Sequence, residues 1–447
     1  MERVSTGIEG LDPLIEGGFP KGSLILLAGA PGTGKTVFGF KFLLHGASEL
    51  NEPSLLVSFG EGRETLLRNM SYHLKCNTED LRCVEILDFV TVKEAGIDSL
   101  MEIILEKVDS MNAERIVIDS FSAMIYAFRE RIDVRVFTHI ISKLIRQTGC
   151  TTILILETPT GSDKLGTGVE EFVADGIIRL KKSIENGRLL RQLEILKMRG
   201  VRIRRPRYLF TLEGGFRVFP EFTMKQLNEK IKFLPLKGTD TTYSSGSWDL
   251  DEVLRGGWPK GSVNLLEIGS NVNFEAYMSV ISMTGLNFIM QGKKVLIYDP
   301  LRLSYDYIKR TMAPIVGEED FNSLVKSYPK GISDLRWLEE ESKDAVYAFV
   351  SFDALAHRYG ENLAFKTILQ ISRSIKSNDG LLLIGSFLDG PRLDHIKTFS
   401  TMSRTHLRII EMEGAVILYG VKPRTGYYVL GIDASKGIFE PELTPIL

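Results

Sequence analysis

One segment of this chain occurs twice, and the duplication limits the accessible folds more than any other feature. Residues 5–23, STGIEGLDPLIEGGFPKGS, align without a gap on residues 244–262, SSGSWDLDEVLRGGWPKGS, and ten of the 19 pairs are identical. Such self-similarity is the sign of a repeated structural unit. The chain has 447 residues, and single cores stop growing at roughly 250–300 residues. The sequence therefore predicts two tandem domains of one fold, residues 1–222 and 244–447, joined by a polar linker over 223–243.

Apolar runs alternate with amphipathic runs in the first copy, and the second copy repeats this rhythm. The predicted strands are 23–29, 54–59, 84–89, 115–120 and 151–157, and the predicted helices include 36–50, 64–74, 99–111 and 134–147. This alternation is typical of an α/β fold in which helices cover both faces of a mostly parallel sheet. We therefore expect an α/β sheet domain in each half.

Composition and charge narrow the class of protein. The chain is 44% hydrophobic and 25% charged with a net charge of −2, so no strong overall field draws it to nucleic acid or to a membrane. Its longest apolar runs are much shorter than the ~20 residues of a membrane span, and its N-terminus does not read as a signal peptide. Three cysteines, Cys76, Cys83 and Cys150, suggest reduced thiols. We expect a cytoplasmic protein that does not contact a membrane.

A phosphate-binding loop follows the first predicted strand and opens the first predicted helix. The eight residues fit the pattern G-x-x-x-x-G-K-T and are Gly29, Ala30, Pro31, Gly32, Thr33, Gly34, Lys35 and Thr36. Glycines allow several backbone N–H groups to surround one phosphate, and the helix N-terminus reinforces the attraction. Lys35 is expected to reach the β- and γ-phosphates and Thr36 to ligate Mg²⁺. The sequence thus predicts that ATP and Mg²⁺ bind to the first copy.

Two carboxylates are expected near this loop. Asp119 ends the apolar strand Ile116–Ile118, so it should lie at the carboxyl edge of the sheet and hold the Mg²⁺ shell. Glu61 follows the strand 54–59 at the same edge and is the candidate to orient the attacking water or accept its proton. A helix cap at Asp119 and an ordinary surface glutamate at Glu61 are the alternatives.

The second copy has lost the residues of a phosphate-binding loop. Its segment GSNVNFEA places Asn271 and Asn273 at the two glycine positions, Phe274 at the lysine position and Glu275 at the threonine position. An apolar ring and a carboxylate in these places should reject a nucleotide phosphate. The strand AVYAFVSF matches IVIDSFSAM best with Val350 at the position of Asp119. We therefore expect a domain that keeps the fold and does not bind ATP.

With these motifs in place, the chain resembles the KaiC-like branch of the RecA superfamily of ATPases. The resemblance rests on the extended P-loop segment from Ser5 to Thr36, on VSFGEGRETLLRN and IVIDSFSAM, and above all on GVEEFVADGIIRL and LEILKMRG. It covers the first half and, more weakly, the second. The resemblance implies a RecA-type core in each half and a ring, usually of six subunits, with ATP bound between neighbours. It also implies that the K-x-R of LEILKMRG, Lys197 and Arg199, acts on the neighbour's γ-phosphate.

The chain also departs from the family pattern. Family members often carry two adjacent glutamates after the second strand, where this chain has Gly60 and Glu61, so slow hydrolysis is expected. In KaiC the second domain is the autokinase, and with its P-loop lost here we do not expect kinase activity. The K-x-R survives in the second copy as Lys422-Pro423-Arg424, without a role that the sequence assigns.

Three functions fit these features. The first is a KaiC-like ATPase ring with a regulatory or signalling output and a regulatory protein partner. The second is a nucleotide-gated scaffold that scarcely hydrolyses ATP and binds a partner through its second domain. The third is a recombinase-like, DNA-dependent ATPase, for which the basic stretch Lys197–Arg207 is the main support. Nucleic acid binding is the least favoured of the three, because the loop 161–168 carries one lysine and no aromatic residue for base stacking.

Overall fold

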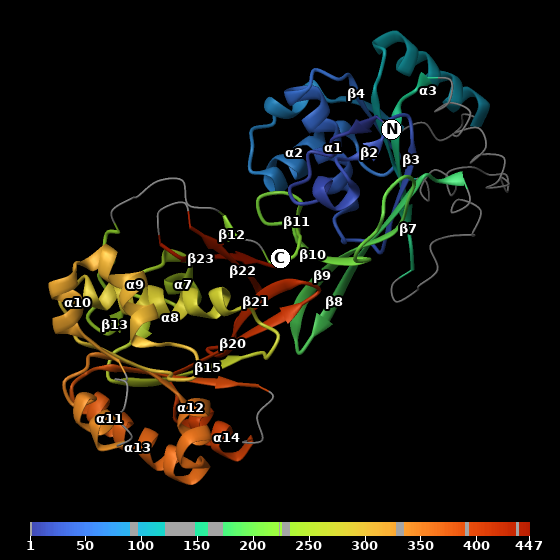
Figure 1. The fold of residues 1–447 in the computed structure, drawn as a ribbon. Helices are drawn as coiled ribbons and strands as arrows, with labels where there is room; N and C mark the ends of the chain where they lie inside the picture. The colour runs from blue at the N-terminus through green and yellow to red at the C-terminus, as the bar shows by residue number, and fades with distance from the viewer. Residues whose placement is uncertain are drawn as a thin grey trace. The chain divides into compact units, whose positions relative to one another are not determined.

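The chain forms two compact units in a computed structural model (Figure 1). The first unit comprises Met1–Glu221 with Ile446–Leu447, and the second comprises Phe222–Pro445. The structure describes residues 2–89, 97–120, 148–159, 173–222, 224–225, 233–327, 335–388, 393–434 and 438–447. The predicted helix 134–147 and the loop 161–168 lie outside the described residues. A separate linker over 223–243 stays a prediction, since 226–232 also lie outside them.

A nine-stranded sheet is the centre of the first unit. From one edge to the other its strands are β11 (Arg217–Phe219), β10 (Arg207–Thr211), β9 (Arg188–Met198), β8 (Gly176–Glu185), β3 (Leu24–Gly29), β7 (Thr151–Glu157), β6 (Arg115–Asp119), β4 (Ser54–Ser58) and β5 (Glu85–Asp88). The six strands from β8 to β5 run parallel, whereas β9, β10 and β11 add an antiparallel extension. The parallel part ends in one common carboxyl edge.

Both faces of this sheet are buried, as the uninterrupted apolar strands predict. Along β3, Ile25 and Leu27 point into one core, and Leu24 and Leu26 point into the other. The first core is shared with α1 (Lys35–Glu49) and α2 (Arg63–Leu74), and the second with α3 (Ile97–Met111). Short elements complete the unit: the 3₁₀ helices η1 (Asp12–Ile15) and η2 (Asp80–Cys83), and the strand pair β1 (Arg3–Val4) and β2 (Phe19–Pro20).

The second unit is built around a ten-stranded sheet. Its strands in order are β12 (Met224–Lys225), β22 (Tyr428–Asp433), β21 (Ala415–Lys422), β20 (Thr405–Met412), β15 (Ser262–Ile268), β19 (Leu381–Phe387), β18 (Tyr347–Ser351), β16 (Val295–Tyr298) and β17 (Val325–Ser327), and β23 (Glu440–Pro445) pairs with β22. The described helices are α7 (Trp248–Val253), α8 (Phe274–Ile289), α9 (Tyr305–Val316), α10 (Glu318–Leu324), α11 (Leu335–Glu341), α12 (Phe352–Tyr359), α13 (Glu361–Ser377) and α14 (Leu393–Met402). The pair β13 (Thr242–Tyr243) and β14 (Trp258–Pro259) corresponds to β1 and β2.

The two units repeat one fold, which confirms the α/β prediction of tandem RecA-like domains. The order β9-β8-β3-β7-β6-β4-β5 recurs as β21-β20-β15-β19-β18-β16-β17. Helices α1 and α8 begin at Lys35 and Phe274, two positions that the repeat also pairs. Within the described ranges, none of the helices combines the length and the apolar character needed to cross a bilayer.

Candidate nucleotide site

The loop between β3 and α1 has the backbone shape that phosphate binding requires. Gly32 has a φ of 73° and Gly34 a φ of 99°, in the left-handed region that side chains disfavour. A Cβ at Gly34 would also lie 2.8 Å from Leu212 Cδ2, so only glycine fits there. No side chain caps the first turn of α1, which leaves its N–H groups facing the loop. The loop and the helix N-terminus together form an anion site.

Lys35 is held inside the same loop. Its Nζ donates to the carbonyl oxygens of Gly29 at 2.9 Å and Ala30 at 3.0 Å, and the side chain is buried. Burial lowers the pKa of Lys35, while the nearby carboxylates of Glu157 and Asp119 act in the opposite direction. The ammonium therefore rests on loop carbonyls that a bound phosphate can replace as its partners.

Thr36 and Asp119 meet at the carboxyl edge of the sheet. The Thr36 Oγ1 donates to Asp119 Oδ2 at 2.6 Å. Burial raises the pKa of Asp119, and the Thr36 hydrogen bond and the Lys35 charge oppose this effect. A hydroxyl and a carboxylate are oxygen ligands of the kind that Mg²⁺ takes. This donor set, placed directly beside the phosphate loop, fits a magnesium ion.

The loop that carries Glu61 lies beside Asp119 because β4 and β6 are neighbours. Ser58 pairs with Asp119 across these strands, and the Ser58 Oγ donates to the backbone oxygen of Glu61 at 2.7 Å. The Glu61 Oε2 accepts from Asn69 Nδ2 at 2.9 Å. Glu61 is exposed. The carboxylate is thus oriented from α2 and exposed to water.

Three further charged residues lie at this site, and the sequence analysis missed them. Glu157 ends β7 and pairs with Gly29, so the strand-end argument that found Asp119 applies to it as well. Arg191 Nη1 donates to the Gly32 oxygen at 3.3 Å. A Cβ built on Gly32 would lie 3.4 Å from the Lys182 Nζ. Lys182 and Arg191 pair across β8 and β9. Their local sequence gives no indication that they contact the P-loop.

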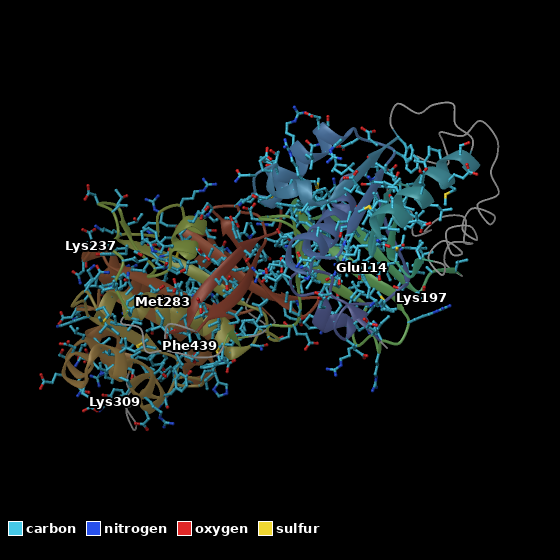
Figure 2. The ribbon with its side chains drawn as sticks, turned by 90° about the horizontal axis from the view of Figure 1, so that it is seen from above. Glu114, Lys197, Lys237, Met283, Lys309 and Phe439 are labelled. Carbon is cyan, nitrogen blue, oxygen red and sulfur yellow. The ribbon has the colours of Figure 1, made fainter. Side chains whose placement is uncertain are left out.

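The structure does not bring Lys197 and Arg199 to the P-loop of the same chain. Arg199 Nη1 pairs with Asp175 Oδ1 at 2.7 Å, and Asp175 Oδ2 accepts from the backbone of Leu24. Leu24 begins β3, whereas the P-loop follows its end at Gly29, about 16 Å further along the strand. Lys197 lies at the rim of the first unit (Figure 2). Both cations are therefore placed at the opposite edge of the sheet from the phosphates of their own chain.

The comparisons with known proteins agree with this site. Residues 4–221 match the model of the family described as "ATPase: KaiC". The first unit therefore belongs to the KaiC-like family. The circadian clock oscillator protein KaiC of Thermostichus vulcanus is 30% identical over 312 residues, covering 67% of this chain and 57% of that protein. The same protein of Acaryochloris marina is 32% identical over 279 residues, covering 59% of this chain and 51% of that protein.

The chain spans only 51–57% of the length of these curated KaiC relatives. Among solved structures, a crystal structure of a KaiC-like protein from Pyrococcus horikoshii OT3 is 36% identical, with a TM-score of 0.45, and covers 49% of this chain and 99% of that chain. The family match assigns an ATPase domain to the first unit.

Outside the segment that matches the KaiC family model, the loop of the second unit has a different conformation. Neither Asn271 nor Asn273 has a positive φ, although the corresponding glycines do. Asn271 Nδ2 donates to Glu411 Oε2 at 2.7 Å, and Val272 is buried. Phe274 packs edge-on against Tyr277 and Tyr307. The loop of the second unit therefore lacks the left-handed glycines and the lysine that a phosphate-binding loop uses.

The strand register corrects one prediction for the second unit. Val350 pairs with Ile384, which pairs with Leu265, whereas Ile118 pairs with Leu154, which pairs with Leu26. Leu265 is the repeat of Leu26, so Val350 takes the position of Ile118. The position of Asp119 belongs to Ser351, whose hydroxyl caps α12 by accepting from Ala354 N. The prediction of Val350 was wrong by one residue, although the carboxylate is absent in either case.

Proposed function

We propose that the first unit binds ATP with Mg²⁺ and hydrolyses it slowly, in an oligomeric ring with a regulatory or signalling output. The observation that carries this proposal is the bond between Thr36 and Asp119 beside a loop with phosphate-binding backbone geometry. A KaiC ATPase domain over residues 4–221 supports it.

The side chains have separate roles in the proposed reaction. The loop N–H groups and Lys35 hold the β- and γ-phosphates, and Thr36 and Asp119 hold the metal. When bound, Mg²⁺ offsets the negative charge that develops on the phosphate oxygens. Glu61, oriented by Asn69, positions the attacking water. A single oriented carboxylate at this place is consistent with slow turnover.

The ring is proposed from the position of the trans cations. Lys197 and Arg199 lie away from the P-loop of their own chain, so a role in hydrolysis requires a nucleotide that a neighbour holds. A cation supplied by the next subunit makes hydrolysis depend on assembly. This arrangement suits a closed ring with head-to-tail contacts, of which a hexamer is the family form.

The second unit is proposed as a pseudo-ATPase domain without kinase activity, which packs the ring or binds a regulatory partner. Its loop has Phe274 in place of the phosphate-binding lysine and lacks the left-handed glycines, and its strand lacks the metal carboxylate. The scaffold function, with ATP held and scarcely hydrolysed, therefore remains the second candidate.

DNA-dependent activity is the weaker alternative. Within the basic stretch 197–207, Arg199, Arg205 and Arg207 already pair with acidic residues of the first unit. Cations that are paired in this way release fewer counterions on binding DNA, so they contribute less to affinity.

The decisive experiment measures the ATPase rate per subunit against protein concentration for the natural chain, for Glu61→Gln and for the matched control Glu64→Gln on α2. The ring proposal expects a rate that rises with concentration and falls only in Glu61→Gln. Bound ATP with no turnover in any variant would favour the scaffold. Stimulation by single-stranded DNA that disappears at high salt would favour the recombinase-like function.

A further inference from the structure

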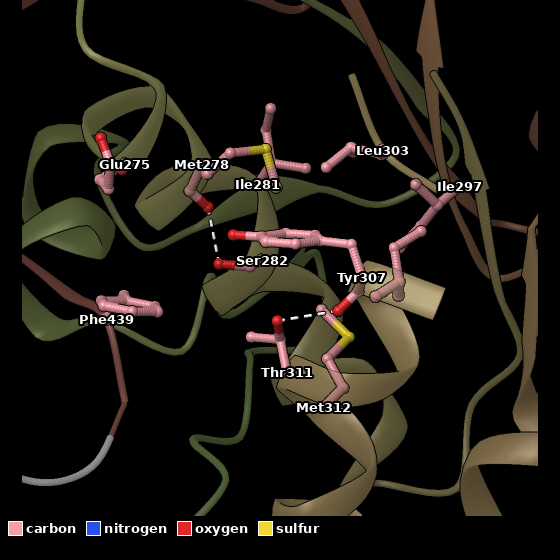
Figure 3. Close-up of a pocket in the computed structure, with 11 residues that line it drawn as sticks. Glu275, Met278, Ile281, Ser282, Ile297, Leu303, Tyr307, Thr311, Met312 and Phe439 are labelled. Carbon is pink, nitrogen blue, oxygen red and sulfur yellow. Dashed lines mark hydrogen bonds between the residues drawn. The ribbon is translucent and has the colours of Figure 1, made fainter. Parts of the chain in front are cut away.

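A small pocket opens in the second unit between α8 and α9. Figure 3 shows it with the floor made by Ile281, Ile297 and Met312. Its free volume is about 30 Å³. Since a water molecule needs about 10–15 Å³ measured in the same way, the pocket admits two or three non-hydrogen atoms. This room suits the tip of a branched side chain and is too small for a nucleotide or a cofactor.

The corresponding place in the first unit has larger side chains from its helix. By the repeat, Ile281 and Ser282 of α8 take the positions of Phe42 and Leu43 of α1. Phe42 and Leu43 are completely buried, and the ring of Phe42 packs beneath the Arg115 guanidinium. The second unit has lost an aromatic ring and an isobutyl group here. The pocket is therefore a feature of the second copy and not of the shared fold.

The rim of the pocket offers hydrogen-bond acceptors. The Ser282 hydroxyl donates to the Met278 oxygen at 2.6 Å, and the Thr311 hydroxyl donates to the Tyr307 oxygen at 2.9 Å, as Figure 3 shows. Among the described residues, Glu275 is the one charged residue that lines the pocket, and its carboxylate makes no ion pair or hydrogen bond with them. The rim thus favours a group that brings positive charge and N–H donors.

We propose that this pocket docks a partner protein through a leucine- or methionine-sized side chain that lies next to a lysine or arginine. The side chain fills the apolar floor, and the basic group pairs with Glu275. A protein segment is favoured over a small ligand because the rim is open: Glu275 is exposed, and so is Tyr307, at 39%. Aromatic and charged groups around a buried apolar centre are the pattern of a protein interface. The inference rests on the partner-binding role proposed for the second unit.

The test uses the full chain with ¹³C-labelled methionine methyl groups, because Met278 and Met312 line the pocket. The probe is a blocked lysine-leucine-lysine tripeptide, with a glutamate-leucine-glutamate tripeptide as its charge-reversed control. The proposal expects saturable shifts of both methyl signals with the basic probe only. Glu275→Gln should weaken that affinity about two- to fivefold, as for an exposed ion pair. Ser282→Leu, which restores the residue of the first unit, should abolish the shifts, and Ser282→Ala should leave them intact.

Several results would overturn the docking proposal. These are an absence of shifts at millimolar probe, equal binding of the acidic tripeptide, and retained binding in Ser282→Leu. Binding of isopentylamine without binding of the tripeptide would assign the pocket to a small amine instead. Shifts that follow protein concentration alone would assign it to a second copy of the chain. The assay does not need ATP, so failure of the proposed ATPase would leave its outcome unchanged.

Discussion

Thr36 donates a 2.6 Å hydrogen bond to Asp119, although 83 positions separate them in the chain. The bond joins the first turn of α1 to the end of β6 and brings a hydroxyl and a carboxylate to one point beside the phosphate loop. Each of the two residues is supplied by a different element, and the parallel sheet aligns the ends of those elements. The catalytic proposal depends on this pairing more than on the P-loop alone.

Asp119→Asn is expected to remove ATP hydrolysis while the fold persists. Asparagine can keep a hydrogen bond to Thr36 but loses the charge that we propose holds the metal. Loss of several kcal/mol of metal-dependent stabilisation corresponds to a rate decrease on the order of 10²-fold or more. The measurement is steady-state turnover over a Mg²⁺ titration, with Asp109→Asn on the exposed face of α3 as the control. Full activity of Asp119→Asn would remove Asp119 from the metal site.

Arg199→Ala is expected to be inactive by itself. It should regain turnover when it is mixed with a second inactive variant, Lys35→Ala. In a mixture with Lys35→Ala subunits, an intact P-loop from the Arg199→Ala chain can meet an intact Arg199 of its neighbour. Random mixing in equal parts gives about one quarter intact interfaces in a closed ring. The mixture should therefore recover activity that neither protein has by itself. Arg202→Ala, in the same basic stretch, is the control that should stay active, and no recovery in the mixture would place Arg199 in cis or outside catalysis.

The sequence was sufficient for those parts of the site that are contiguous or that end an apolar strand. The P-loop could be predicted because its glycines and the helix N-terminus that binds phosphate are adjacent in the chain. Asp119 and Glu61 were found because the carboxyl ends of parallel strands share an edge. The same argument would have found Glu157, which ends the strand 151–157.

Other parts of the site depend on contacts that leave no local pattern. Arg191 and Gly32 are 159 positions apart in sequence, and they meet only because β9 pairs with β8 and β8 pairs with β3. The Val350 prediction was wrong for a different reason. The strand AVYAFVSF is apolar almost throughout, so no polar residue fixes its alignment, and a shift of one position goes unnoticed until the register is seen.

A buried carboxylate with two nitrogen partners in the second unit gives a stability prediction. Glu267 Oε2 accepts from Arg408 Nε at 2.7 Å and lies 2.5 Å from His406 Nε2, and Glu267 and His406 are both buried. Burial pushes the pKa of Glu267 upward, but the hydrogen bonds from His406 and Arg408 outweigh it and leave the pKa lowered. The stabilisation is thus present above the unfolded-state pKa and is lost as pH falls through the lowered value.

His406→Ile alone is expected to destabilise the second unit by roughly 3–5 kcal/mol, because it removes one partner of the buried carboxylate. The double variant Glu267→Ala/His406→Ile installs the residues that the first unit has at these positions, Ala28 and Ile177. It should recover most of the loss, since the installed pair is apolar and Arg408, which loses Glu267, is 35% exposed and can be hydrated. Urea unfolding of both variants tests the prediction, and an equal loss in the two would assign the effect to packing.

Asp299 is expected to make the second unit less stable as pH rises from about 4 to 6. It directly follows β16, is 4% exposed, and its Oδ1 has no hydrogen-bond partner among the described residues. Burial raises the pKa of Asp299 to about 6, and Arg302 opposes the rise. The folded state therefore keeps a proton that the unfolded chain releases near pH 4, so the free energy of unfolding falls through this window and levels off above it. A rise of about two pKa units corresponds to roughly 3 kcal/mol.

Asp299→Asn should remove this pH dependence of stability. Its urea midpoint should exceed that of the natural chain at pH 7 and approach it at pH 4. Asp240→Asn, on an exposed turn, should follow the natural chain at both pH values, and an Asp299→Asn midpoint that does the same would show that the Asp299 carboxyl titrates at its ordinary pKa.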